Sequence, residues 1–163
     1  KSLFILSLII NVILLLVILK IESKIILKRE KIVITPHPKE FTQILHITGI
    51  ADIDTLSLQK ERFKYVELFC STYPNVILIL KGSNVLIGHN RQFFINPLGT
   101  VALAKGGSGD ILSGLVGALL AQGYSPIEAA ISASLAHAQS AKNFIKNNFA
   151  LTPFDLIEEL TKL

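Results

Sequence analysis

The sequence predicts an α/β fold, because short β-branched or apolar runs alternate with segments that carry the apolar spacing of helices. The run Val76–Leu80 is entirely apolar, as in a strand that is buried on both faces of a sheet. Ser125–Glu128 and Thr152–Asp155 both place a hydroxyl residue before Pro and an acidic residue two positions beyond that Pro, which is the start signal of a helix. A length of 163 residues, half of them hydrophobic, suits one domain with one core.

Apolar spacing, glycines and prolines divide the chain into elements. In the first half we expect, in chain order, a strand at Lys31–Thr35, a short helix at Lys39–His46, one helix over Leu58–Tyr73, and a strand at Val76–Leu80 followed by the turn Lys81-Gly82-Ser83. In the second half we expect a hairpin of Val85–Ile87 and Phe93–Ile95 across Gly88-His89-Asn90, a loop at Asn96–Gly99, a helix at Asp110–Gln122 closed by Gly123, a helix from Ser125 to about Phe144, and a helix at Leu156–Leu160.

The positive charge of the chain is concentrated at its N-terminus. The formal net charge is +4, and residues 1–31 hold six basic and two acidic side chains, so the other 132 residues balance ten against ten. A neutral body argues against a nucleic-acid partner. The aromatic side chains do not interleave with a basic patch, and we expect four of them in the core: Phe63, Phe69, Phe93 and Phe94.

A single cysteine, Cys70, excludes an internal disulfide and a Cys-based zinc site. We expect it to be a small buried residue of a helix, and its presence alone is consistent with a reducing cytoplasm. No pair of histidines has the spacing of metal ligands, so we predict no metal site held by protein side chains alone. His46 and His89 are expected at the surface, and His137 as a hydrogen-bonded core or surface residue.

The segment Leu3–Leu19 is apolar except for Ser7 and Asn11, and two interpretations of it remain open. Its 17 residues are at the lower limit of a membrane span, and they also suit a buried strand with flanking core. No cleavage pattern follows it, which argues against a signal peptide. Because the sequence contains no Met, we do not expect Lys1 to be a translational start, and we expect a processed chain or a piece of a longer one.

The segment Lys105–Asp110, with sequence KGGSGD, opens directly into an apolar helix. Its three glycines let the backbone approach a ligand, and the free N–H groups of the helix start favour an anion such as phosphate. Asp110 would repel that anion unless it serves as a base or holds Mg²⁺. The alternative interpretation is an ordinary glycine turn in which Asp110 stabilises the helix dipole.

Two further segments follow predicted strands, where ligands of open α/β sheets gather. Thr35–Glu40, with sequence TPHPKE, carries two prolines that fix the loop around His37. Lys81–Ser83 places a lysine where it would meet a phosphate as a point charge. Taken singly, a rigid turn and a solvated lysine are equally good interpretations.

Together and in this order, these segments resemble the NAD(P)H-hydrate dehydratase family of the ribokinase-like superfamily. The matching stretches cover most of the chain from about Lys31 onward: ITPHPKEF at Ile34–Phe41, LKGSNVLI at Leu80–Ile87, the stretch Ile95–Ala130 that contains GGSGD, and FALTPFDLIEEL at Phe149–Leu160. The resemblance implies the C-terminal part of a three-layer α/β/α fold with a mostly parallel sheet.

The family repairs hydrated NADH and NADPH (NADHX and NADPHX). The resemblance implies that ADP or ATP phosphorylates the hydroxyl of the damaged nicotinamide ring, that loss of phosphate restores the ring, and that Mg²⁺ bridges the phosphates. It assigns the general base, which also contacts the substrate, to Asp110, and a second substrate contact to His37. The transferring phosphate would be held by Gly106, Gly107, Ser108 and Gly109, and the adenine nucleotide by Lys81, Gly82, Ser83, Asn84, Val85 and Gly109.

The chain departs from the family pattern at its N-terminus. Most of the family's N-terminal half is absent, and Asn11–Lys20 holds no acidic residue where the family has an acidic motif after a strand. We therefore divide the chain into a divergent segment 1–30 and a nucleotide-binding part 31–163, and we expect dependence on, or fusion to, an N-terminal half. The charge asymmetry favours a divergent strand or helix over a membrane anchor. A small-molecule kinase for a vitamin-precursor alcohol, an inactive or membrane-anchored remnant, and a homo-oligomer remain open alternatives.

Overall fold

The computed structural model describes residues 32–145 and 147–163. The two interpretations of Leu3–Leu19 and the predicted segment 1–30 lie outside the described residues. No helix in the described ranges combines the length and the apolar character that a bilayer crossing requires.

The described residues form short strands followed by helices, as the alternating pattern predicts. The strands are β1 (Ile32–Ile34), β2 (Val76–Leu80), β3 (Val85–His89) and β4 (Gln92–Asn96). The helices are α3 (Pro38–Thr48), α4 (Thr55–Lys60), α5 (Arg62–Thr72), α6 (Ser108–Ala121), α7 (Pro126–Asn143) and α8 (Pro153–Leu160), with short 3₁₀ turns η1 (Val101–Leu103) and η2 (Asn148–Ala150).

The strands form one sheet in the order β1-β2-β3-β4. β1 runs parallel to β2, with Val33 opposite Ile77, and both later pairs are antiparallel. The described part of the sheet is thus mixed rather than mostly parallel, because the β3–β4 hairpin reverses the chain direction. The parallel pair is the important one for the site, since it brings the carboxyl ends of β1 and β2 to one edge.

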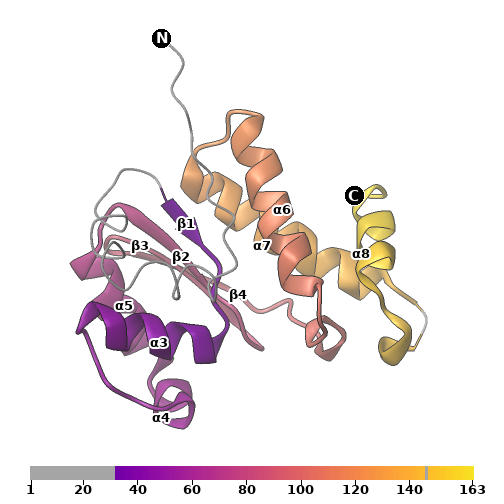
Figure 1. Ribbon diagram of the computed structural model, residues 1–163. Helices are drawn as coiled ribbons and strands as arrows, with labels where there is room; N and C mark the ends of the chain where they lie inside the picture. The colour runs from indigo at the N-terminus through magenta and orange to yellow at the C-terminus, as the bar shows by residue number, and fades with distance from the viewer. Residues whose placement is uncertain (1–31, 146) are drawn as a thin grey trace.

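The side chains of β2 alternate between two cores, which accounts for its unbroken apolar sequence. Val76, Leu78 and Leu80 pack with α3 and α5, whereas Ile77 and Ile79 pack with α6 and α7. Figure 1 shows these two helix pairs on opposite sides of the sheet. The predicted three-layer α/β/α arrangement is therefore confirmed.

The three C-terminal helices begin and pack as their sequences predict. Ser125 and Thr152 each accept a hydrogen bond from the backbone of the acidic residue three positions on, so both predicted capping boxes are present. α8 contacts α6 and α7 and adds a small third core around Leu151 and Leu156. Gly123 follows α6 with a φ of +93°, as its predicted place after the helix requires.

The single helix predicted over Leu58–Tyr73 is wrong. The chain forms α4 and α5, which are separated at Glu61, where φ is −132° and ψ is 37°. Periodicity hid this break, because the buried side chains Leu58 and Tyr65 keep a helical spacing across it. Because of this break, α5 begins at Arg62.

The predicted hairpin has the right strands and the wrong turn. Gly88 and His89 are part of β3, and the turn is formed by Asn90 and Arg91, with Asn90 at φ +55°. This strand position requires a glycine because α5 packs closely against it: a Cβ at Gly88 would lie 2.6 Å from Cys70 Sγ. The glycine marks a close approach to α5 and not a turn.

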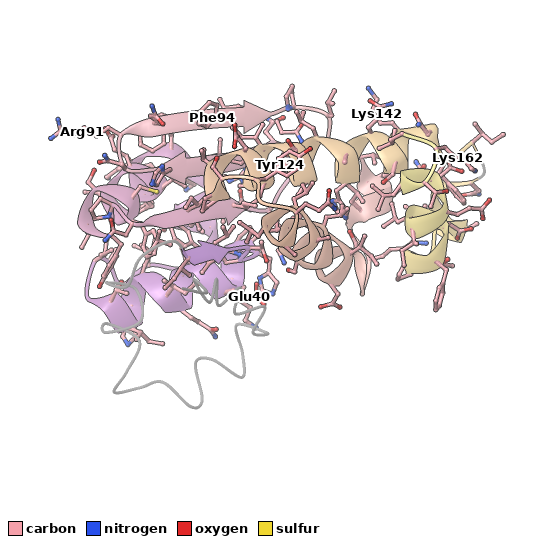
Figure 2. All side chains as sticks on the ribbon, turned by 90° about the horizontal axis from the view of Figure 1, so that it is seen from above. Glu40, Arg91, Phe94, Tyr124, Lys142 and Lys162 are labelled. Carbon is pink, nitrogen blue, oxygen red and sulfur yellow. The ribbon has the colours of Figure 1, made fainter. Side chains whose placement is uncertain are left out.

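Two of the four aromatic residues expected in the core are at the surface. Phe69 is fully buried and Phe93 packs against the first core, but Phe63 is 47% exposed and Phe94 is 38% exposed. Phe94 is on β4, the last strand in the order of the described sheet (Figure 2), whereas Phe63 packs against Phe93 in a tilted arrangement with ring centroids 4.9 Å apart. Cys70 is buried as predicted, and burial raises the pKa of its thiol to about 12.

Candidate functional site

The loops that follow β1 and β2 are joined by a backbone hydrogen bond. Lys81 donates its N–H to the carbonyl of Pro36 at 3.0 Å, immediately beyond the paired part of the two strands. This bond places the predicted TPHP and LKG segments side by side. The expectation that both lie at the carboxyl edge of the parallel strand pair is therefore confirmed.

His37 and Glu40 form a capping box at the start of α3. The His37 backbone N–H donates to Glu40 Oε2 at 2.7 Å, and His37 Nδ1 accepts from the Glu40 N–H at 3.1 Å. His37 Nε2 lies 3.3 Å from Glu40 Oε1, so both ring nitrogens of this histidine are turned toward Glu40. This arrangement fixes the imidazole ring, whose side chain is 45% exposed.

The Lys81 side chain reaches from the end of β2 toward the starts of α3 and α6. Its ammonium lies 4.0 Å from Glu40 Oε2, and a Cβ added to Gly109 would be only 2.9 Å from Lys81 Nζ. Burial lowers the pKa of Lys81, and the charges of Glu40 and Asp110 oppose that shift. Lys81 is thus not a fully solvated lysine: it is a partly buried cation beside Glu40 that also feels the charge of Asp110, and Gly109 gives it room.

The start of α6 lacks a side-chain cap. Its N-cap is Gly107 in the left-handed region at φ +85°, and no side chain bonds to its first backbone N–H groups. Within residues 32–145 and 147–163, the N–H groups of Gly109 and Asp110 have no acceptor, whereas the Ser108 N–H donates to the Lys105 carbonyl at 3.4 Å. Two donors at the positive end of a fourteen-residue helix are therefore available to an anion.

Residues from α7 and from the C-terminal segment hold this helix start in place. His137 Nε2 lies 2.9 Å from the Ser108 carbonyl oxygen and 3.2 Å from Ser108 Oγ, and both residues are buried. Burial lowers the pKa of His137, the charge of Lys81 acts in the same direction, and the bond to the Ser108 carbonyl opposes them. A Cβ at Gly107 would lie 2.6 Å from Pro153 Cγ, so α8 also packs against the glycines.

Lys105 has a structural role at the other end of the KGGSGD segment. Its ammonium donates to the carbonyl oxygens of Phe149 and Leu151 in the segment before α8. This lysine therefore fastens the glycine loop to the C-terminal segment and does not extend into the space beside Gly109.

The turn after β2 is exposed to solvent, and its backbone is held by hydrogen bonds from Arg62. Gly82, Ser83 and Asn84 are exposed, and Val85 is half-buried at the start of β3. From behind, Arg62 donates to the carbonyl oxygens of Leu80 and Lys81, at 3.3 and 3.2 Å. The backbone of the turn is thereby held while its outer surface remains accessible.

The structure brings together most of the predicted site residues and adds two that were not predicted as site residues. Lys81 lies beside Glu40 and beside Gly109 at the start of α6. Glu40 also contacts His37, and Arg62 bonds to the Lys81 carbonyl. Glu40 was visible as the fourth residue of a capping pattern that begins at His37, although a histidine in that place is unusual. Arg62 gave no local signal, because its partners are 18 and 19 residues further along the chain. Figure 2 labels Glu40, which lies in the first turn of α3, near α6.

The arrangement combines an anion-binding helix start with a cation and two carboxylates. Such a set would hold a phosphate through the Gly109 and Asp110 N–H groups and Lys81, and Asp110, which is exposed, would meet a substrate proton. No cluster of three metal-ligating side chains occurs among the described residues. Glu40 and Asp110 nevertheless fit Mg²⁺ that arrives on phosphates, because this ion needs only one or two carboxylates from the protein.

Comparisons with known proteins agree with this geometry. The family model described as NAD(P)H-hydrate dehydratase, of the carbohydrate-kinase type, matches residues 14–162. The bifunctional NAD(P)H-hydrate repair enzyme Nnr of Helicobacter pylori is 52% identical over 134 residues, which are 82% of this chain and 28% of the relative.

Two solved structures show the same fold. The ADP/ATP-dependent NAD(P)H-hydrate dehydratase of Bacillus subtilis, co-crystallized with ATP and Mg²⁺ and soaked with CoA, aligns with a TM-score of 0.72 at 28% identity, over 83% of this chain and 51% of that one. A ribokinase-like superfamily protein of Enterococcus faecalis aligns with a TM-score of 0.68 at 25% identity, over 82% and 43%.

The chain spans about a quarter to a half of the length of these relatives. The matched region nevertheless covers most of this chain and contains every element of the site described above. The chain therefore belongs to the NAD(P)H-hydrate dehydratase family, with a ribokinase-like fold.

Proposed function

We propose that this chain is the nucleotide-binding part of an ADP- or ATP-dependent dehydratase that converts NADHX and NADPHX back to NADH and NADPH. One observation carries the proposal: the uncapped start of α6 offers the N–H groups of Gly109 and Asp110, beside the ammonium of Lys81 and the carboxylate of Asp110. Family membership and the names of the relatives support the substrate class.

The glycine loop would hold the phosphate that is transferred. The backbone of Gly106 to Gly109 has no side chain except that of Ser108, which is buried and turned toward His137. A phosphate would approach the backbone closely there, with Lys81 supplying positive charge from the opposite side. The exposed turn Gly82–Asn84 and Val85 would contact the rest of the adenine nucleotide.

Asp110 would act as the general base on the substrate hydroxyl. It removes the proton as the hydroxyl oxygen attacks the terminal phosphorus of ADP or ATP, which leaves AMP or ADP. The phosphate then departs with the electrons of the C–O bond, and loss of a ring proton restores the double bond. Mg²⁺ would neutralise charge on the phosphates, and Glu40 and Asp110, the two carboxylates whose charges act on Lys81, would be available to hold it.

His37 would contact the hydrated dinucleotide. Its ring is fixed by Glu40 on the nitrogen side, and its side chain remains 45% exposed. This arrangement suits packing against a substrate better than proton transfer, because both nitrogens are engaged by Glu40. The free thiol of Cys70 supports a cytoplasmic location, and the bifunctional relative supports fusion to or dependence on a further part.

The experiment measures two properties of the full 163-residue chain: its affinity for ATP and ADP by calorimetry, and its conversion of NADHX to NADH by absorbance. Asp110→Ala is expected to lower turnover by about 10²-fold or more, the contribution of a general base, while ATP binding remains. Asp52→Ala is the matched control, since Asp52 is exposed and pairs with His46, which lies about 12 Å along α3 from Pro38.

Each outcome has a distinct meaning. ATP binding without turnover would assign the chain the nucleotide-binding role and require the relatives' remaining part for catalysis. Turnover of Asp110→Ala at the wild-type rate would contradict the base assignment. A phosphorylated product that accumulates without NADH would favour the small-molecule kinase, and absence of both binding and turnover would favour the remnant.

A further inference from the structure

Arg62 is the first residue of α5 and lies beneath the turn that follows β2. Its place depends on the break at Glu61, because a continuous helix through residues 58–73 would direct this side chain elsewhere. The arginine NH2 group donates to two successive carbonyl oxygens, those of Leu80 and Lys81, at 3.3 and 3.2 Å. One guanidinium nitrogen therefore holds both residues at the end of β2.

The charge of Arg62 is not matched by a carboxylate. Among the ion pairs of the described residues none involves Arg62, and the adjacent Glu61 pairs with Lys64 at 2.9 Å. Its Nε is buried without a hydrogen-bond partner. A partly buried cation that contacts only carbonyl dipoles is costly, which argues for a role beyond helix stability.

Gly82 allows the guanidinium to approach the turn. A Cβ at this position would lie 2.7 Å from Arg62 NH2 and 3.0 Å from Cζ. The guanidinium of Arg62 thus occupies space that a side chain at Gly82 would fill. The Lys81 N–H also donates to the Pro36 carbonyl at 3.0 Å. The peptide group between Leu80 and Lys81 is therefore bonded at its carbonyl by Arg62 and at its N–H by Pro36.

From these contacts we propose that Arg62 is a positioning residue for the nucleotide: it fixes the Lys81–Gly82 turn so that the Lys81 ammonium lies beside the start of α6. The proposal rests on the proposed function, because it assumes that this turn receives ADP or ATP. Arg62 acts through the backbone of the turn and through Lys81. Its unmatched positive charge would also favour the polyphosphate.

Lysine cannot reproduce this arrangement. The planar guanidinium presents several donors in a fixed geometry, whereas an ammonium is a strongly hydrated point charge on a flexible chain. Arg62→Lys is therefore expected to keep the charge and lose most of the fixation. Arg62→Met loses both and keeps a similar length.

The test compares wild-type chain, Arg62→Lys, Arg62→Met and the control Arg91→Met. Arg91 is exposed in the hairpin turn and projects from the molecule far from Glu40 (Figure 2). The readouts are the dissociation constant for ATP, and hydrogen exchange of the Lys81 and Gly82 amides in the absence of nucleotide. We expect Arg62→Met to weaken ATP binding about tenfold or more, Arg62→Lys to lie between, and Arg91→Met to equal wild type.

A purely structural role would lower thermal stability and leave ATP affinity and amide exchange at the turn unchanged, which would overturn the proposal. Faster exchange at Lys81 and Gly82 together with weaker ATP binding supports it. If Arg62→Met does not fold, Arg62→Lys decides by the same two readouts. If the wild-type chain binds no ATP, the proposed function fails as well; equal affinity of wild type and variants overturns this inference alone.

Discussion

The adjacent helices α6 and α7 begin in opposite ways. At α7, Ser125 N–H donates to Glu128 Oε2 at 3.0 Å and Ser125 Oγ accepts from the Glu128 N–H, so side chains satisfy the helix start. At α6, Gly107 provides no such group, and the N–H groups of Gly109 and Asp110 stay without an acceptor in the described ranges. The two helices pack against each other.

We infer from this difference that the start of α7 is structural and that the start of α6 is adapted to a ligand. The start of α8 also has a capping box, as expected where a helix start only needs to be stable. At α6, support comes instead from outside the helix, through His137 on α7 and Pro153 on α8. This support leaves the N–H groups of the helix start open.

The largest effect is expected from removing that external support. His137→Leu leaves the buried Ser108 carbonyl without its donor, and we expect a loss of about 2 kcal/mol in the free energy of unfolding. Urea unfolding at neutral pH measures it. His46→Leu is the control, because His46 is exposed and its ring pairs with exposed Asp52. If both variants lose the same stability, His137 does not support the start of α6.

The same histidine predicts a pH dependence. The unfolded chain protonates His137 near the ordinary pKa of 6.5, whereas the folded chain does so only at lower pH, since burial lowers its pKa. Protonation thus favours the unfolded state: the contribution is fully present above about pH 6.5 and is lost as pH falls through the lower folded pKa. Unfolding curves of wild type and His137→Leu should converge on acidification, and parallel curves would contradict this account.

A smaller effect is expected at Gly109, where a methyl group would displace the Lys81 ammonium. The added Cβ lies 2.9 Å from Lys81 Nζ, and a flexible lysine end moves aside at little cost in stability. We therefore expect Gly109→Ala to weaken ATP binding about tenfold, or ~1.4 kcal/mol, by calorimetry.

Gly114→Ala is the matched control in the same helix. Nothing lies within 4 Å of a Cβ at Gly114, so this variant should gain about 0.5–1 kcal/mol of stability and keep its ATP affinity. Equal affinities of the two alanine variants would show that the space beside Gly109 is not part of the nucleotide site.

The smallest effect tests the capped helix. Ser125→Ala removes the cap of α7, and a loss of about 1 kcal/mol in unfolding free energy is expected with no change in ATP affinity. Thermal or urea unfolding gives the first value and calorimetry the second. A reduced ATP affinity here would remove the distinction between the two helix starts.

The sequence predicted what local signals encode. The caps of α7 and α8, the buried strand β2 and the closing Gly123 were all visible, because each depends on residues within a few positions. The glycine loop at the start of α6 was visible for the same reason. Hydrogen-bonding residues and glycines carry strong local preferences.

Features that depend on distant partners could not be predicted. Gly88 has the residue type of a turn, but it is in a strand, at a position where the close contact of Cys70 and Val66 leaves no room for a Cβ. The break at Glu61 and the role of Arg62 become evident only when α5 meets the end of β2. Phe63 and Phe94 were assigned to the core from their type alone, although their positions on α5 and β4 leave them exposed.

The central claim is that the uncapped start of α6 binds the phosphates of the nucleotide. The most direct test is a titration of the isotope-labelled chain with ATP and Mg²⁺, followed by NMR of the backbone amides at the two helix starts. The account predicts large shifts and slowed exchange for the Gly109 and Asp110 amides, and unchanged signals for Ile127 and Glu128 at the start of α7. Signals of Gly109 and Asp110 that stay unmoved while ATP binds would contradict it.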